Sequence, residues 1–120
     1  MKTKVSEATP HQLDLLVASI TRPGRVSRGR LGSAYCWDAW GRPMEYLPST
    51  DWQTGGPIIE REGIDLIYER NCDGEIVQIW AQIGEDIPPE YFGDTGLIAA
   101  MRCFVASKLG DEVEIPGELQ

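Results

Sequence analysis

Apolar residues in the first part of the chain recur at the spacing of one face of an α-helix. The repeating positions are Leu13, Leu16, Val17 and Ile20. Thr9 can cap such a helix, and Pro10 fits its first turn, where the N–H that proline lacks has no intrahelical acceptor. The pattern therefore predicts an amphipathic helix over residues 10–20.

A second helix is predicted over residues 51–62, with an interruption inside it. Thr50 is placed to cap this helix, and Asp51 favours the positive end of its dipole. Gly55-Gly56-Pro57 interrupts the pattern, because a proline inside a helix removes one backbone hydrogen bond. We therefore expect a short turn followed by a helical restart that ends at Gly63.

The last third of the chain carries the longest apolar stripe with helical spacing. Its members are Leu97, Ile98, Met101, Phe104, Val105 and Leu109. Asp94 or Thr95 can cap this helix, and Gly110 can close it. The sequence therefore predicts a helix over residues 95–109, followed by a loosely attached acidic tail over residues 111–120.

Two β-strands are predicted between the second and third helices, at Ile64–Glu69 and Glu75–Ile83. Asp73-Gly74 lies between them and is typical of a hairpin turn. Both strands carry apolar side chains on both of their faces. We therefore expect a sheet that is at least partly covered on each side.

Residues 21–48 have the weakest pattern. Residues 35–37 and 44–47 are candidates for short strands, and the arginine run, spaced by Gly, Ser and Pro, favours a loop. Together the patterns predict one α+β domain over residues 1–120. Its small antiparallel sheet, the hairpin 64–83 plus one or two short strands, packs with the three helices.

The composition fits one globular domain with a modest core, since the chain has 120 residues and is 42% hydrophobic. Residues 1–44 hold seven Lys/Arg and three Asp/Glu (+4), and residues 45–120 hold four and sixteen (−12), giving the net charge of −8. An acidic chain is repelled by nucleic acid. The acidic residues could mimic the phosphates of DNA toward a DNA-binding partner, although an ordinary solvated surface is the simpler interpretation.

Four arginines close together in sequence are the exception to this acidity: Arg22, Arg25, Arg28 and Arg30. They could contact phosphate, so a nucleic-acid partner is the alternative hypothesis for this chain. Nucleic acid is not the favoured partner, because the arginines lack the interleaved aromatic residues of a nucleic-acid-binding surface.

Asp94-Thr95-Gly96 matches the active-site triplet of aspartic proteases, in which two such carboxylates share a proton. In those enzymes the triplet follows an apolar strand, whereas here it leads into a helical pattern, so a helix cap is favoured. No Ser or Cys is placed to use the single histidine, His11. We therefore predict no catalytic residue, and an Asp94 protease is the least favoured alternative.

The cysteines have no C-x-x-C spacing and are expected to be free thiols: Cys36, Cys72 and Cys103. The sequence also lacks the glycine-rich patterns that cradle phosphates. We therefore predict no metal site and no cofactor.

Aromatic residues and a double glycine make the middle of the chain the best candidate for a partner-binding site. Its candidate residues are Trp37, Trp40, Asp51, Trp52, Gly55, Gly56 and Arg61. Burial in the core is the simpler interpretation of the tryptophans. We expect a protein partner of unknown identity, and the sequence does not decide the oligomeric state.

We predict that the protein is located in the cytosol. The longest apolar run, Leu97–Met101, is too short to span a bilayer, so no membrane partner is expected. The N-terminal residues show no secretory signal pattern.

Ser49–Trp52 followed by Gly55–Glu62 forms one distinctive run, and Leu97–Cys103 with its continuation to Val113 forms another. In this order, the two runs resemble the NinX-like proteins of lambdoid phages and enterobacterial prophages. The chain is also similar to a broader group of phage domains built as helix–sheet–helix sandwiches. The function of the NinX-like family has not been established. The resemblance therefore implies a small phage or prophage accessory protein in the host cytoplasm, and it identifies no catalytic residue.

Overall fold

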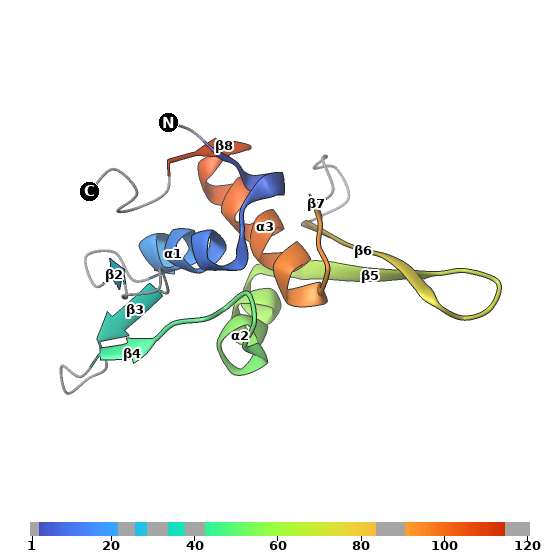
Figure 1. The fold of residues 1–120 in the computed structure, drawn as a ribbon, viewed down its shortest axis with the longest axis horizontal. Helices are drawn as coiled ribbons and strands as arrows, with labels where there is room; N and C mark the ends of the chain where they lie inside the picture. Colours follow the sequence, from blue (N-terminus) through green and yellow to red (C-terminus); the bar gives the residue numbers. More distant parts are fainter. Residues whose placement is uncertain (1–2, 22–25, 29–33, 38–42, 84–90, 115–120) are drawn as a thin grey trace.

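Helix α3 (Gly96–Leu109) lies at the centre of the fold, and the other elements pack around it (Figure 1). Nine of its 14 residues are buried, so it is surrounded on most of its sides. The computed structural model describes residues 3–21, 26–28, 34–37, 43–83 and 91–114.

Short helices separate groups of short strands along the chain. The helices are η1 (Val5–Glu7), α1 (Pro10–Thr21), α2 (Trp52–Glu62) and α3. The strands are β1 (Thr3–Lys4), β2 (Val26–Arg28), β3 (Ala34–Trp37), β4 (Pro43–Glu45), β5 (Ile64–Arg70), β6 (Ile76–Ile83), β7 (Tyr91–Phe92) and β8 (Glu112–Val113). This arrangement confirms the α+β prediction. None of the helices described is long and apolar enough to cross a bilayer.

The predicted helix caps explain where α1 and α3 begin. Gln12 donates its backbone N–H to the Thr9 hydroxyl (3.2 Å), and the Gln12 side chain accepts from the Thr9 N–H (3.0 Å). Thr95 caps α3 by accepting the N–H of Ile98 (3.2 Å). Both helices therefore lie where their apolar periodicity predicted them, although Leu109 at the end of the α3 stripe is exposed.

The described strands form three antiparallel sheets, in the orders β1–β8, β2–β3–β4 and β5–β6–β7. The predicted hairpin forms the largest sheet, with β5 paired to β6 from Ile64 opposite Ile83 to Arg70 opposite Ile76. Gly74 has a positive φ of 83°, as the predicted turn requires. In Figure 1 this hairpin projects to the right, well beyond the helices.

Helix α3 covers one face of the hairpin, where Ile64, Leu66 and Ala81 pack into the core. The opposite face carries Ile67 and Trp80, which are only half-buried. The two faces therefore agree with the prediction of a sheet that is at least partly covered on each side, and the second face is covered less than the first. The apolar residues of the second face are paired with each other across the strands.

Helix α2 runs without interruption through Pro57, so the predicted turn and restart are wrong. The proline removes one hydrogen bond, to the carbonyl of Gln53, but Gln53 is exposed, so water can satisfy that carbonyl. The cap is Asp51 and not Thr50, because the Asp51 carboxylate accepts the N–H of Gln53 (3.1 Å). Gly63 ends the helix in a left-handed conformation, as predicted.

The region 21–48 contains more regular structure than its sequence pattern indicated. Strand β2 pairs with β3, and β3 pairs with β4, so part of the predicted arginine loop is a strand that ends at Arg28. The three short strands form an antiparallel meander. Their pairing with one another compensates for the weak preference of these residues for strand structure. The residues that surround β2, including Arg22, Arg25 and Arg30, lie outside the described residues.

The segment expected to be a loose acidic tail begins with an ordered pairing. Val113 is buried and lies opposite Thr3, so β8 ties the end of α3 to the beginning of the chain. Asp111 also accepts the N–H of Val5 through its backbone carbonyl (2.8 Å). Residues 115–120 of that segment lie outside the described residues.

The buried carboxylate of Asp14 joins α1 to the loop before α2. Its Oδ1 accepts the backbone N–H of Ser49 (2.8 Å), whereas its Oδ2 is buried with no hydrogen-bond partner. Only 1% of the residue is exposed. Burial raises the pKa of Asp14 from 3.8 to about 6, and the hydrogen bonds from Ser49 oppose part of that shift.

We predict that Asp14 makes the protein more stable in mild acid than at neutral pH. Because the folded state holds the proton more tightly, the stability from the protonated carboxyl is lost as the pH rises from about 4 to above 6. The loss amounts to roughly 3 kcal/mol of unfolding free energy. The measurement is the difference in unfolding free energy between wild type and Asp14→Asn, obtained from denaturant titrations at several pH values.

The exposed Asp73 provides the control, since Asp73→Asn changes the same chemical group outside the core. It reports what replacing a carboxylate by an amide outside the core does to the unfolding free energy. A constant difference between wild type and Asp14→Asn from pH 4 to pH 7 would show that the carboxyl does not titrate as described.

Candidate functional site

The binding residues predicted on α2 do not form one site. Trp52 is 54% exposed at the start of the helix, and Arg61 is exposed near its end, where its Nε donates to Glu62 (3.2 Å). Nine residues separate them, which places them on opposite sides of an α-helix. Asp51 is engaged by Gln53 and by the Thr54 hydroxyl, so its carboxylate serves as a cap.

The two glycines of this segment differ in their surroundings. Gly55 is buried, and a Cβ atom built on it would lie 2.3 Å from the carbonyl oxygen of Pro48 and 2.6 Å from Leu97 Cδ2. A Cβ atom built on Gly56 would make only an ordinary van der Waals contact, with Trp52 Cε3 at 3.9 Å. Gly55 is therefore a packing residue that lets α2 approach α3.

The other sequence candidates are spread over the molecule. Trp37 lies at the end of β3 and Arg28 at the end of β2, while Trp40 lies outside the described residues. The nucleic-acid hypothesis for the arginines therefore stays a prediction. Asp94 is exposed directly before α3, and its neighbour Thr95 caps that helix, as the helix-cap interpretation expects.

The described cysteines differ in reactivity. Cys72 is exposed in the hairpin turn, whereas Cys103 is buried in α3. Burial raises the pKa of the Cys103 thiol to about 11, so it stays protonated and unreactive at neutral pH. Within the ranges described, no three His, Cys, Asp or Glu side chains come close enough together to hold a metal ion.

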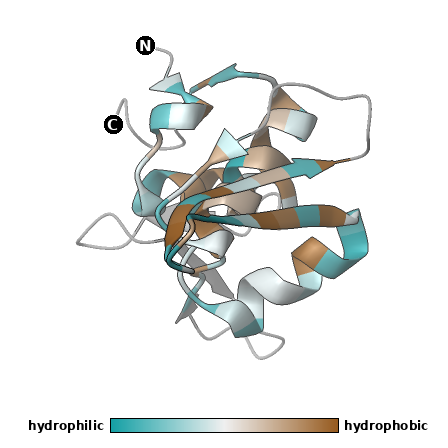
Figure 2. Cartoon of the chain, turned by 90° about the vertical axis from the view of Figure 1, so that its right-hand side faces the viewer, coloured by the Kyte–Doolittle hydropathy of each residue, from teal (hydrophilic) through white to brown (hydrophobic). Residues whose placement is uncertain are grey.

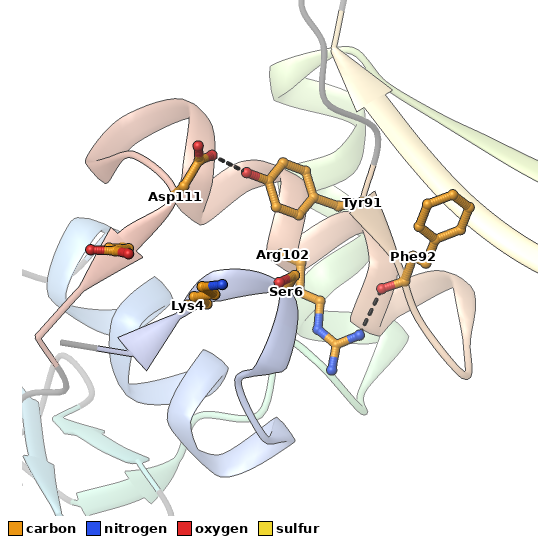
Figure 3. Close-up of a pocket in the computed structure, with 7 residues that line it drawn as sticks. Lys4, Ser6, Tyr91, Phe92, Arg102 and Asp111 are labelled. Atoms are coloured by element: carbon orange, nitrogen blue, oxygen red, sulfur yellow. Dashed lines mark hydrogen bonds between the residues drawn. The ribbon is translucent and has the colours of Figure 1, made fainter.

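A hollow of about 500 Å³ lies where the two chain ends meet β7 and α3 (Figure 3). Its lining comes from β1, η1, β7, α3, β8 and the residue before β8. The lining residues are Lys4, Ser6, Tyr91, Phe92, Arg102, Asp111 and Glu112. No sequence candidate among the described residues lines this hollow, which is therefore a separate site from the predicted one.

Arg102 is held in place from two directions at the wall of this hollow. Its Nη1 donates to the carbonyl of Phe92 (2.6 Å) and its Nη2 donates to the carbonyl of Ala8 (3.0 Å). Its Nε is buried and has no hydrogen-bond partner. Burial lowers the pKa of Arg102, and the charge of Asp94 opposes that change.

Tyr91 and Asp111 form a second fixed feature of the hollow. The buried Tyr91 hydroxyl donates a short hydrogen bond to the Asp111 carboxylate. Burial and this carboxylate together raise the pKa of Tyr91, so the phenol stays protonated. The pair holds β7 against the segment before β8.

Sequence reasoning missed this hollow because its residues are far apart in the chain and form no motif. One indication was available: Arg102 lies between Met101 and Cys103 in the most apolar helix. A charged residue in such a run has to reach a polar partner at the surface or in a cavity.

A second unusual surface is the projecting end of the β5–β6 hairpin, residues 68–79, which we call the arm. Large apolar side chains on it are exposed to solvent: Tyr68 by 40%, Ile76 by 46% and Val77 by 60%. Figure 2 shows hydrophobic stretches along both hairpin strands. A register shift between Glu69 and Arg70 leaves Val77 as an extra residue of β6, between the paired residues Ile76 and Gln78.

A comparison with known families finds one match, to the model described as bacteriophage P22, NinX. The match extends over residues 4–108 of the 120-residue chain. It includes η1, α1, α2, the arm and almost all of α3. No curated protein matches the chain.

We predict that the two neighbouring glycines respond in opposite ways to the same substitution. Gly55→Ala forces a methyl group against Pro48 and Leu97 and should lower the unfolding free energy by about 1–3 kcal/mol. Gly56→Ala meets no clash and should raise it by up to about 1 kcal/mol, because alanine favours a helix. Thermal and denaturant unfolding of the two variants gives the comparison. Equal effects would refute the close approach of α2 to α3.

Proposed function

We propose that this chain, which belongs to the bacteriophage P22 NinX family, is a phage accessory protein that binds another protein and catalyses no reaction. We place its action in the cytoplasm of the host cell. The observation that carries the proposal is the arm, which projects beyond the helices in Figure 1 and exposes Ile76 by 46% and Val77 by 60% near its tip.

The exposed apolar residues of the arm gain nothing for folding while they face solvent. Full burial of one Val, Ile or Tyr side chain contributes about 1.5–3 kcal/mol. Tyr68, Ile76 and Val77 still expose 40–60% of their surfaces, so covering them with a partner would contribute about 1 kcal/mol each. A few residues that each contribute about this much free energy are typical of a small protein-binding site.

The charges of the hairpin indicate which partner the arm would accept. Four carboxylates, those of Asp65, Glu69, Asp73 and Glu75, stand beside a single arginine, Arg70. A partner with apolar side chains flanked by Lys or Arg fits this surface, whereas the phosphates of nucleic acid would be repelled.

The arm is also rigid, which supports a binding role. Asn71 accepts the N–H groups of Asp73 (2.9 Å) and Glu75 (3.0 Å) through its side chain, and Arg70 donates to the carbonyl of Gly74 (3.0 Å). Nearer the body, Trp80 Nε1 donates to Glu69 (2.6 Å). A fixed arm loses little conformational entropy on binding.

The test begins with capture of the partner by the purified protein from extracts of infected and uninfected cells, followed by purification of that partner. Val77→Ser is then expected to weaken the measured affinity roughly fivefold, since it removes about 1 kcal/mol of apolar contact. Raising the salt concentration should weaken binding further, because the arm is acidic.

Leu109→Ser is the matched control, because Leu109 is 47% exposed but lies at the end of α3. It should leave affinity unchanged, and neither substitution should alter stability by more than about 0.5 kcal/mol. The proposal fails if neither extract yields a partner at micromolar concentrations. It also fails if the two substitutions weaken binding equally.

A further inference from the structure

The hollow between the chain ends and α3 contains cationic and hydroxyl groups that the protein itself leaves unused. Lys4 and Arg102 have no carboxylate within 4 Å among the described residues, although the chain carries a net charge of −8. The Ser6 hydroxyl makes no hydrogen bond to another described residue. All three groups line the same hollow (Figure 3).

We propose that this hollow binds a single oxyanion group, a carboxylate or a phosphate, through Lys4, Ser6 and Arg102. The proposal is independent of the arm and of its partner.

Arg102 is already positioned for such a ligand. Two of its five N–H donors are fixed on the carbonyls of Phe92 and Ala8, so the guanidinium cannot swing into solvent. Carbonyl groups satisfy those donors but leave the positive charge without a counterion. An oxyanion in the hollow would provide the missing counterion. Because the side chain is already fixed, little conformational entropy would be lost on binding.

The acidic residues of the hollow limit what can bind. The carboxylate of Asp111 accepts a hydrogen bond from the Tyr91 hydroxyl, and Glu112 is exposed at the start of β8. They would repel a polyanion such as a nucleic-acid backbone. They leave room for one oxyanion next to the cationic groups, and the ring of Tyr91 offers an apolar wall beside it.

The test uses three small probes at constant ionic strength, followed by NMR of the full chain. N-acetylphenylalanine represents a terminal carboxylate, its amide is the uncharged match, and inorganic phosphate represents a phosphorylated group. Saturable shifts are expected at the Ser6 amide and at the Arg102 Nε–H with at least one of the two anions. The amide should cause none, and the anion that binds more tightly identifies the group.

Lys4→Gln is expected to weaken binding of that anion roughly threefold to tenfold. Arg61→Gln removes an equal charge on α2, outside the hollow, and should leave affinity unchanged. Ser6→Ala provides a second variant, with a smaller loss, if Lys4→Gln disturbs the pairing of β1. The proposal is overturned if neither anion binds, if the amide binds as well as the acid, or if Lys4→Gln and Arg61→Gln have equal effects.

Discussion

Close packing around helix α3 is the constraint on which the rest of the structure depends. Ala99 and Ala100 are fully buried, and they allow neighbouring elements to approach the helix axis closely. At Gly96 a Cβ atom would lie 2.2 Å from the Tyr68 hydroxyl, so a side chain at that position would force the Tyr68 side chain away from α3. Gly55 plays the same part for α2. The positions of the elements around α3 therefore depend on small residues at a few close contacts as much as on the large apolar residues of the core.

A central helix also decides where a charge can be placed. Arg102 lies in the buried run of α3. Its guanidinium finds hydrogen-bond acceptors there by reaching the carbonyls of Phe92 and Ala8. The bond to Ala8 spans 94 positions of sequence, so one side chain ties the beginning of the chain to its last helix. The hollow follows from this arrangement, because the Arg102 guanidinium, β7 and β8 meet there. Folding and anion binding would therefore draw on the same residue.

The sequence predicted the elements that local chemistry determines. The apolar period of α3, the capping box at Thr9 and the Asp73-Gly74 turn each specify their structure within a few residues. Pro57 misled the prediction, since the loss of one bond at an exposed carbonyl is small beside the burial of Ile58 in the same helix. The hollow could not be predicted, because its groups come from both ends of the chain and only the packing of α3 brings them together.

The arm and the hollow differ in how far each is constrained by folding. Ile76 and Val77 face solvent, so their replacement leaves the core intact, and a partner that covered them would act on residues the core does not need. Arg102 and Tyr91 hold elements together, so their presence is explained by stability whether or not a ligand binds. Lys4 separates these cases, because it is exposed and makes no ion pair within the described residues. It lies opposite Glu112 in the β1–β8 pairing, yet no described carboxylate comes within 4 Å of its ammonium group, so this charge remains available to a ligand in the hollow.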